Sequence, residues 1–259
     1  MMNIMQIRNA TQLIAYAGKR FLIDPMLAEK DAYPGFAGTA RAHLRNPLVE
    51  LPVPIERLLD VDAIIVTHTH PDHWDDAAAA AIPKSMQIYV QNASDEAILR
   101  AQGFTQLRQL SDTSRFGDIM LTKTHGQHGS DAAYAIPELA QRLGEACGVV
   151  FQHPDEKTLY LIGDSIWTKG IEENLRRYQP DVVIMNTGWA HLLGFGPIIF
   201  GMEDVLKAHC LLPQAQIVAT HMEALNHCLV TRSALLEYAR DNEIETFVSA
   251  PADGDTVTY

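Results

Sequence analysis

The chain has 259 residues, of which 47% are hydrophobic and 20% are charged, and its 20 Lys and Arg against 32 Asp and Glu give a formal net charge of -12. This composition can bury a sizeable core in one domain over residues 1–259, and it excludes disordered and fibrous proteins. The negative charge, with no local basic patch to offset it, argues against a nucleic-acid partner and favours a small-molecule one.

The three cysteines, Cys147, Cys210 and Cys228, show no paired spacing, so we expect neither a disulfide framework nor a thiolate zinc site. A reducing, cytoplasmic location fits this usage. Residues 182–202 contain no Asp, Glu, Lys or Arg and are long enough to cross a membrane, but four Gly and Pro197 interrupt them. We therefore predict a buried strand followed by a Gly-rich loop, and no membrane span.

The first part of the chain alternates short apolar strands with helical patterns. Residues 26–54 are punctuated by proline and carry few regular signals, so we predict a long loop with short helical pieces there. In chain order, the predicted elements are strands at 3–7, 12–16 and 21–23 (the last two a hairpin through 17–20), a strand at 63–66, a helix at 75–81, a strand at 87–90, and a helix at 94–102 with Ser94 as its N-cap.

The second part of the chain continues this alternation, and no internal repeat or linker-like segment divides it. The predicted elements are strands at 106–109, 119–124, 148–152 and 158–162, a helix at 168–178, a strand at 182–185, a helix at 203–211, a strand at 216–219, a helix at 231–241 and a final strand at 246–249. These patterns together predict an α/β domain.

A cluster of metal-ligand side chains follows the predicted strand at 63–66. Residues 67–73 read Thr-His-Thr-His-Pro-Asp-His, which places His68, His70, Asp72 and His73 within six residues. Pro71 excludes a helix, so these side chains converge on a turn. Neutral imidazole and carboxylate suit zinc, and also manganese or iron. The alternative is a polar turn without a metal, in which close imidazoles would repel one another when protonated.

Three later strand ends also carry residues of this kind. The strand at 119–124 leads to His125 and His128, the strand at 158–162 leads to Asp164, and the strand at 216–219 leads to His221. In a sheet whose strands run the same way, such ends lie along one edge. We therefore expect these side chains to complete a two-metal site.

In this order and spacing, the residues resemble the metallo-β-lactamase superfamily of hydrolases, with motifs at 21–25, 67–73, 126–129, 162–164 and 220–221. The resemblance implies an α/β fold, a four-layer αββα sandwich of two mixed sheets flanked by helices. It also implies a first metal bound by His68, His70 and His128, a second bound by Asp72, His73 and His221, and Asp164 bridging both. Asp24 would support the metal-binding loop, and His125 would have a supporting or structural role.

Within the superfamily, residues 74–76 and 221–227 are most similar to the branch that contains ascorbate-6-phosphate lactonase-like proteins and N-acylphosphatidylethanolamine-hydrolysing phospholipase D. Neither Cys nor Lys occupies the second-metal positions, which departs from the antibiotic-hydrolysing members and argues against a true β-lactamase. The chain has no room for the extra domain of the RNA- and DNA-processing members.

The resemblance implies a hydrolase with two divalent metal ions, zinc first and manganese or iron as alternatives. Such ions would hold a bridging hydroxide that Asp72 orients for attack on a small ester, lactone or phosphodiester. His227 is the first candidate for protonating the leaving group, and His191 is its competitor. The alternatives are a di-iron oxidoreductase or dioxygenase on the same fold, and a non-catalytic metal-dependent binding protein. A homo-oligomer is left open.

Two long loops near the ligand-bearing strand ends, residues 26–54 and 188–201, are expected to set substrate specificity. Four aromatic residues in them would either line a pocket or pack the loops onto the body of the protein. These residues are Tyr33, Phe36, Trp189 and Phe195. The remaining histidines, His43, His153 and His209, have no motif context and are expected to be solvated or to cap helices.

Overall fold

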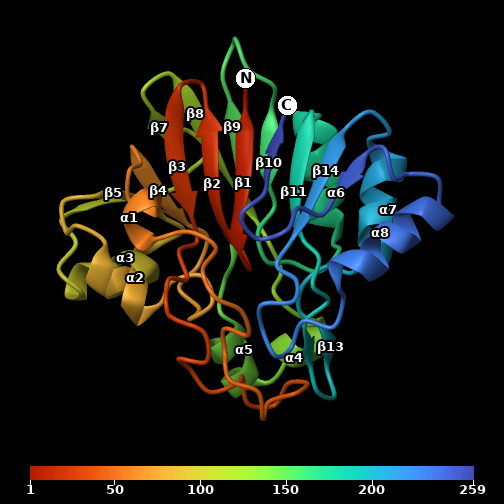
Figure 1. Ribbon diagram of the computed structural model, residues 1–259, viewed down its shortest axis with the longest axis horizontal. Helices are drawn as coiled ribbons and strands as arrows, with labels where there is room; N and C mark the ends of the chain where they lie inside the picture. The colour runs from red at the N-terminus through yellow and green to blue at the C-terminus, as the bar shows by residue number, and fades with distance from the viewer.

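Short apolar runs bounded by turn residues form two mixed β-sheets in the computed structural model, which describes residues 1–259 (Figure 1). The seven strands of the first sheet lie in the spatial order β16 (Thr256–Thr258), β1 (Asn3–Arg8), β2 (Thr11–Tyr16), β3 (Lys19–Ile23), β4 (Ala63–Val66), β5 (Gln87–Val90) and β6 (Gln106–Gln109). Pairing is antiparallel from β16 to β3 and parallel from β3 to β6.

The second sheet also has seven strands. Their spatial order is β15 (Val248–Ser249), β14 (Gln216–Thr220), β11 (Val182–Asn186), β10 (Leu159–Leu161), β9 (Cys147–Gln152), β8 (Ile119–His125) and β7 (Arg115–Phe116). Pairing is parallel from β15 to β10 and antiparallel from β10 to β7. As a result β8, β10 and β14 all run in the same direction, so the residues that follow them lie at one edge.

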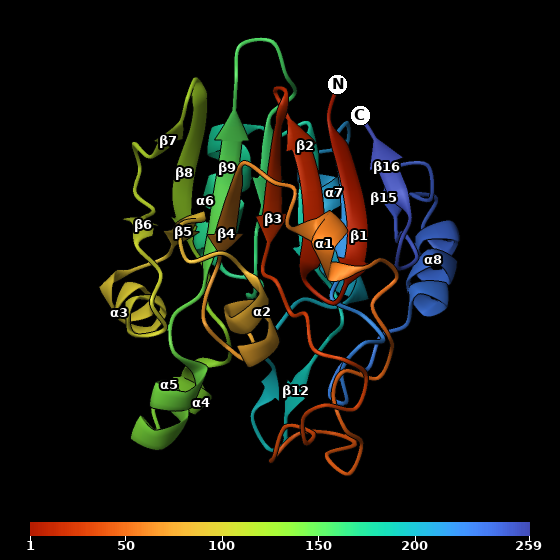
Figure 2. The same cartoon turned by 60° about the vertical axis from the view of Figure 1, so that its left-hand side comes forward.

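Apolar side chains from both sheets meet between them and form one core. Phe21 of the first sheet and Phe151 of the second are fully buried, with ring centroids 5.5 Å apart. Helices cover the outer faces (Figure 2). They are α1 (Ile55–Leu58), α2 (Asp76–Ala81) and α3 (Ala93–Ala101) on the first sheet, and α6 (Lys169–Tyr178), α7 (Met202–Leu211) and α8 (Arg232–Asp241) on the second. The predicted four-layer αββα sandwich is confirmed.

The predicted helix starts are correct where a capping side chain marks them, with one exception. Asp75, Thr168 and Thr231 accept hydrogen bonds from the amides of the first turns of α2, α6 and α8. The prediction of Ser94 as the N-cap of α3 is wrong, because the side chain of Asn92 accepts from the Asp95 amide and starts the helix earlier.

Short elements were harder to predict. Residues 26–54 contain no helix, so the expected helical pieces are wrong, and the chain instead forms isolated bridges such as Thr39 to Leu192. The strand at 246–249 is shortened to β15, and the last strand is β16. Further unpredicted elements are α1, β7, α4 (Asp131–Tyr134), α5 (Pro137–Leu143), β12 (His191–Leu192) and β13 (Gly196–Pro197). Most of these are two to four residues long, too short for periodicity to reveal them.

Loops and small elements gather at one end of the sandwich (Figure 1). Residues 26–54, α4, α5 and the β12–β13 hairpin lie there, beyond the ends of the strands that carry the predicted ligands. The three later strands, β8, β10 and β14, share the second sheet and run the same way as expected, whereas β4 belongs to the first sheet. None of the helices has the length and apolar character needed to cross a membrane.

Candidate metal centre

The turn after β4 carries four of the predicted ligands. The amides of His73 and Trp74 both donate to the carbonyl oxygen of His70, at 2.9 Å each, which closes the turn. Pro71 has no amide hydrogen and restricts the residue before it, so the chain cannot continue as a helix there. The first two ligands of the turn, His68 and His70, enter one cluster, and the next two, Asp72 and His73, enter a neighbouring one.

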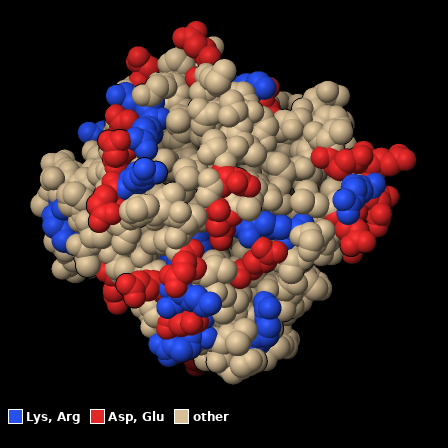
Figure 3. Space-filling model, viewed as in Figure 1, with Lys and Arg blue, Asp and Glu red and all other residues tan.

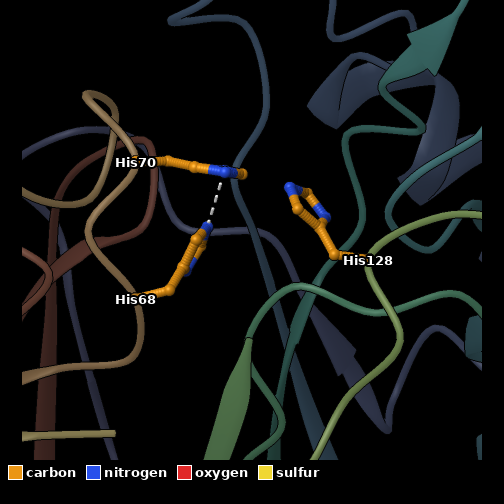
Figure 4. A group of neighbouring side chains, drawn as sticks. All are labelled: His68, His70 and His128. Atoms are coloured by element: carbon orange, nitrogen blue, oxygen red, sulfur yellow. Dashed lines mark hydrogen bonds between the residues drawn. The ribbon is translucent and has the colours of Figure 1, made fainter. Parts of the chain in front are cut away.

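The first cluster contains His68, His70 and His128 (Figure 4). His68 Nε2 lies 3.1 Å from His70 Nδ1, and His128, from the loop after β8, faces this pair from the opposite side. One nitrogen of each ring lies within 4.8 Å of the others. Three imidazoles at this spacing can bind one metal ion and leave a coordination position open.

The second cluster contains Asp72, His73, Asp164 and His221, all of them buried. His221 Nε2 lies 3.2 Å from Asp72 Oδ2 and 3.3 Å from His73 Nε2. His73 Nε2 in turn lies 3.2 Å from Asp164 Oδ2. This donor set of two imidazoles and two carboxylates also suits a divalent ion.

Asp164 lies between the two clusters. Its Oδ2 is 3.6 Å from His128 Nε2 in the first cluster, and 3.7 Å from His221 Nε2 in the second. Its Oδ1 accepts a hydrogen bond of 2.6 Å from Asn186 Nδ2, which fixes the carboxylate plane. One carboxylate oxygen is therefore shared by both groups of ligands.

Backbone carbonyls orient two of the imidazoles through the ring nitrogen that points away from the clusters. His70 Nε2 lies 2.9 Å from the carbonyl oxygen of Arg142, and His128 Nδ1 lies 2.9 Å from that of Ile198. Because a carbonyl oxygen only accepts, these nitrogens carry the proton, and the nitrogen facing the cluster presents a lone pair. That is the form a metal ligand requires.

The Asp24 carboxylate supports both the metal-binding turn and one ligand. Its Oδ1 accepts from the Thr67 amide and its Oδ2 from the Thr67 hydroxyl, each at 2.7 Å. His73 Nδ1 lies 2.8 Å from the same Oδ2. A carboxylate in this position fixes the ring orientation and makes the facing nitrogen a better donor to a metal.

The charges of the second cluster create a negative local potential. Burial opposes a charge on His73, yet the carboxylates of Asp164, Asp72 and Asp24 outweigh burial and raise the pKa of His73 to about 10. In the first cluster, burial lowers the pKa of His70 to about 4. The neutral imidazoles of the first cluster, beside the carboxylates of the second, match the chemistry of divalent cations, so the residues fit a pair of metal ions.

A cavity of about 250 Å³ opens directly onto the clusters. His70, Asp72 and His128 form its ligand side. Four further lining side chains are apolar, and we call them the apolar wall: Phe36, Leu143, Leu192 and Ile198. Its remaining lining residues are Thr39, Pro71, Arg142 and His227. The size and the mixed lining suit a small organic molecule with one apolar end.

The structure separates the two candidate proton donors. His227 lines the cavity, and its ring centroid lies 4.8 Å from that of Phe36. Its Nδ1 is buried without a hydrogen-bond partner, and burial lowers the pKa of the ring to about 4, so the ring is neutral near pH 7. His191 is not among the lining residues and packs against Trp189 instead, with centroids 4.3 Å apart.

The other sequence predictions have mixed outcomes. Of the four aromatic residues suggested for the pocket, only Phe36 lines it. Tyr33 and Phe195 pack against the apolar cluster that contains Leu143, Leu192 and Ile198, and Trp189 is 41% exposed. His125 ends β8 with its side chain exposed, so it supports no ligand. His43 is exposed, whereas His153 and His209 are half-buried.

Sequence reasoning missed most of the apolar wall. Leu143, together with Arg142 beside it, belongs to the end of α5, where a sequence signal was present, because Pro137 is the first residue of the helix and Gly144 follows its end. Leu192 belongs to β12 and Ile198 follows β13, and both lie within residues 188–201, one of the two loops expected to set specificity, although neither residue was singled out.

The surface bears charges of both signs. On the face shown in Figure 3, acidic and basic side chains are interspersed and no continuous basic area is seen. The net charge of -12 is therefore not offset on this face by a patch that would attract nucleic acid.

Known proteins are similar to this chain in sequence and in architecture. Residues 19–222 match the family model described as a beta-lactamase superfamily domain. The chain is 43% identical over 259 residues to UPF0173 protein YddR of Bacillus subtilis, covering 100% of both proteins. An isothiocyanate hydrolase from Delia radicum gut bacteria is 54% identical, with a TM-score of 0.98 and coverage of 100% of this chain and 99% of that one. A possible metal-dependent hydrolase from Veillonella parvula is 45% identical, with a TM-score of 0.98 and complete coverage of both chains.

Proposed function

This chain belongs to the beta-lactamase superfamily, and from that premise we propose that it is a metal-dependent hydrolase that uses two divalent ions to hydrolyse small organic isothiocyanates. The observation that carries the proposal is the position of Asp164 Oδ2, shared by two groups of ligands beside a small cavity with an apolar wall. A shared carboxylate is what a binuclear hydrolase requires.

His68, His70 and His128 would hold one ion, and Asp72, His73 and His221 the other, with Asp164 between them. Divalent ions in such a site supply Lewis acidity and lower the pKa of a bound water toward neutrality. We infer zinc first, because imidazole with carboxylate is its usual donor set, with manganese and iron as the other candidates.

The chain's own residues would orient the reactants. Asp72 lines the cavity, where its carboxylate would accept a hydrogen bond from the attacking water. His227 lines the cavity with a neutral ring, and from Nε2 such a ring could donate a hydrogen bond to the substrate. The apolar wall would hold the organic group of the substrate and exclude water from around it.

The choice of isothiocyanate rests on the relative from Delia radicum gut bacteria, which is named for that activity and is 54% identical over the whole chain. In this reaction water adds to the central carbon of R–N=C=S and gives a thiocarbamic acid. Its carbon–nitrogen bond then breaks with transfer of a proton to nitrogen, which releases the amine R–NH₂ and carbonyl sulfide. The small cavity, lined by three of the candidate metal ligands and by the apolar wall, suits a compact electrophile with an apolar R group.

The test is to assay metal content and hydrolysis together on freshly purified protein. We expect two ions per chain, and release of benzylamine and carbonyl sulfide from benzyl isothiocyanate well above the rate in buffer. A parallel panel of small esters, lactones and phosphodiesters tests the substrates that the sequence alone favoured. One ion per chain after reconstitution contradicts the binuclear site, whereas turnover of the panel without turnover of isothiocyanate contradicts the substrate. Iron with substrate-dependent oxygen consumption would favour the oxidoreductase alternative.

A further inference from the structure

Asn226 is fully buried beside the cavity, and all of its side-chain hydrogen bonds go to one distant segment, residues 36–46. Its Oδ1 accepts from the Phe36 amide at 3.0 Å and from Asn46 Nδ2 at 2.8 Å. Its Nδ2 donates to Thr39 Oγ1 at 3.0 Å and to the Ala40 carbonyl oxygen at 2.7 Å. The Asn226 side chain thus accepts two hydrogen bonds and donates two, and all four partners belong to residues 36–46.

The backbone of Asn226 strengthens the same connection. Its amide donates to Asn46 Oδ1 at 2.8 Å, and its carbonyl oxygen accepts from Arg41 Nε at 2.8 Å. Arg41 also donates through Nη2 to the carbonyl oxygen of Cys228. We call this set of hydrogen bonds between Asn226 and residues 36–46 the Asn226 cluster.

The Asn226 cluster connects two segments that line the cavity, one with Phe36 and Thr39 and the other with His227. On one side it fixes Phe36 and Thr39, which line the cavity. On the other side, Asn226 immediately precedes His227 in the chain, and the His227 ring packs edge-on against Phe36 with ring centroids 4.8 Å apart. Residues 36–46 lack helix or strand, so these hydrogen bonds supply order that regular structure would otherwise supply.

We propose that Asn226 is a positioning residue that holds residues 36–46 over the cavity and thereby sets the size of the apolar group that the site accepts. The proposal rests on the proposed function in that the organic group of the substrate lies against Phe36. Only an amide fits this role, because a carboxylate would lose the two donated hydrogen bonds, and an apolar side chain would leave several buried partners unsatisfied.

Hydrogen–deuterium exchange of the full chain tests the positioning independently of catalysis. In Asn226→Ala, we expect amides of residues 33–46 to exchange at least about tenfold faster, while those of β4 and β11 are unchanged. Arg41→Gln removes two hydrogen bonds from an exposed side chain and should give a smaller change in the same segment. Asn242→Ala is the matched control. The side-chain amide of Asn242, like that of Asn226, donates to a backbone carbonyl oxygen, but its partner is Tyr238 at the end of α8.

Kinetics then test the consequence for the substrate. For Asn226→Ala we expect KM for benzyl isothiocyanate to rise about tenfold, with KM for methyl isothiocyanate and both kcat values changed less than about threefold. Unchanged exchange in residues 33–46, faster exchange throughout both sheets, or equal KM changes for the two substrates would each overturn the proposal. If the wild-type protein hydrolyses neither isothiocyanate, the proposed function fails, while the exchange result still decides whether Asn226 holds the segment.

Discussion

The ligand side and the apolar wall of the cavity are built in different ways. The ligand side comes from short turns at the ends of β4, β8, β10 and β14, and the outward nitrogens of its imidazoles have partners within 3.4 Å. The apolar wall comes from three segments far apart in the chain, and Phe36 is held by a long-range hydrogen bond to Asn226 rather than by a sheet or helix.

This difference indicates how the protein could separate chemistry from substrate choice. A ligand at a strand end is fixed by the sheet behind it, so a small change there would disturb both clusters of ligands. A wall residue contacts only part of the substrate, so a change there alters affinity and leaves the metals in place. Substitutions on the two sides should therefore have effects of different kind and size.

The largest effect is expected at the carboxylate that both clusters share. Asp164→Asn keeps the size of the side chain but removes the charge from the oxygen shared by His128 and His221. We expect loss of at least one metal ion per chain and a fall in kcat of about 10³-fold. Elemental analysis and hydrolysis assays measure both quantities.

Asp62→Asn is the control for this substitution, because the Asp62 carboxylate also accepts hydrogen bonds, from the Arg20 amide and from Lys19, but lies on the surface. If Asp164→Asn retains two ions per chain and a tenth of the wild-type rate, the expected difference between the two sides is contradicted. Substitutions on the ligand side would then be tolerated as well as substitutions in the apolar wall.

Asp24 tests whether the ligand side depends on residues behind the ligands. Asp24→Asn removes the carboxylate that accepts from Thr67 and faces His73 Nδ1. We expect metal affinity to fall about 10- to 100-fold, with most activity restored when the assay contains excess metal. Metal titration in a competing chelator measures the affinity. If affinity is unchanged, the rigidity of the ligand side does not come from this carboxylate.

The sequence predicts the ligand side of the cavity much better than the apolar wall. Residues 67–73 could be predicted because the ligands are close in sequence and Pro71 excludes a helix, and the strands preceding Asp164 and His221 are apolar runs with clear ends. The sequence could not reveal the contact of Asn226 with Phe36, which spans 190 positions and depends on loop geometry. Leu143 was missed for a different reason, since α5 did carry a start signal at Pro137.

His227 lies where the two sides meet, and its effect should be intermediate. We expect His227→Ala to lower kcat about tenfold, because one hydrogen bond to a charge-bearing substrate atom is lost, with the metal content unchanged. His191→Ala, the matched histidine outside the cavity lining, should leave kcat within about twofold. Equal losses of kcat for both variants, or loss of metal from His227→Ala, would contradict the proposed role of His227 as a hydrogen-bond donor to the substrate.

The smallest effect is expected at Ile198, where one residue serves both sides. Its carbonyl oxygen lies 2.9 Å from His128 Nδ1, whereas its side chain belongs to the apolar wall. Ile198→Val removes one methylene from the wall and leaves the carbonyl in place, so we expect KM for benzyl isothiocyanate to rise about threefold, with kcat and metal content unchanged. Ile98→Val, an exposed position on α3, is the control. A loss of metal from Ile198→Val would mean that the wall and the ligands are mechanically coupled, and the separation between chemistry and substrate choice would have to be abandoned at this point of the cavity.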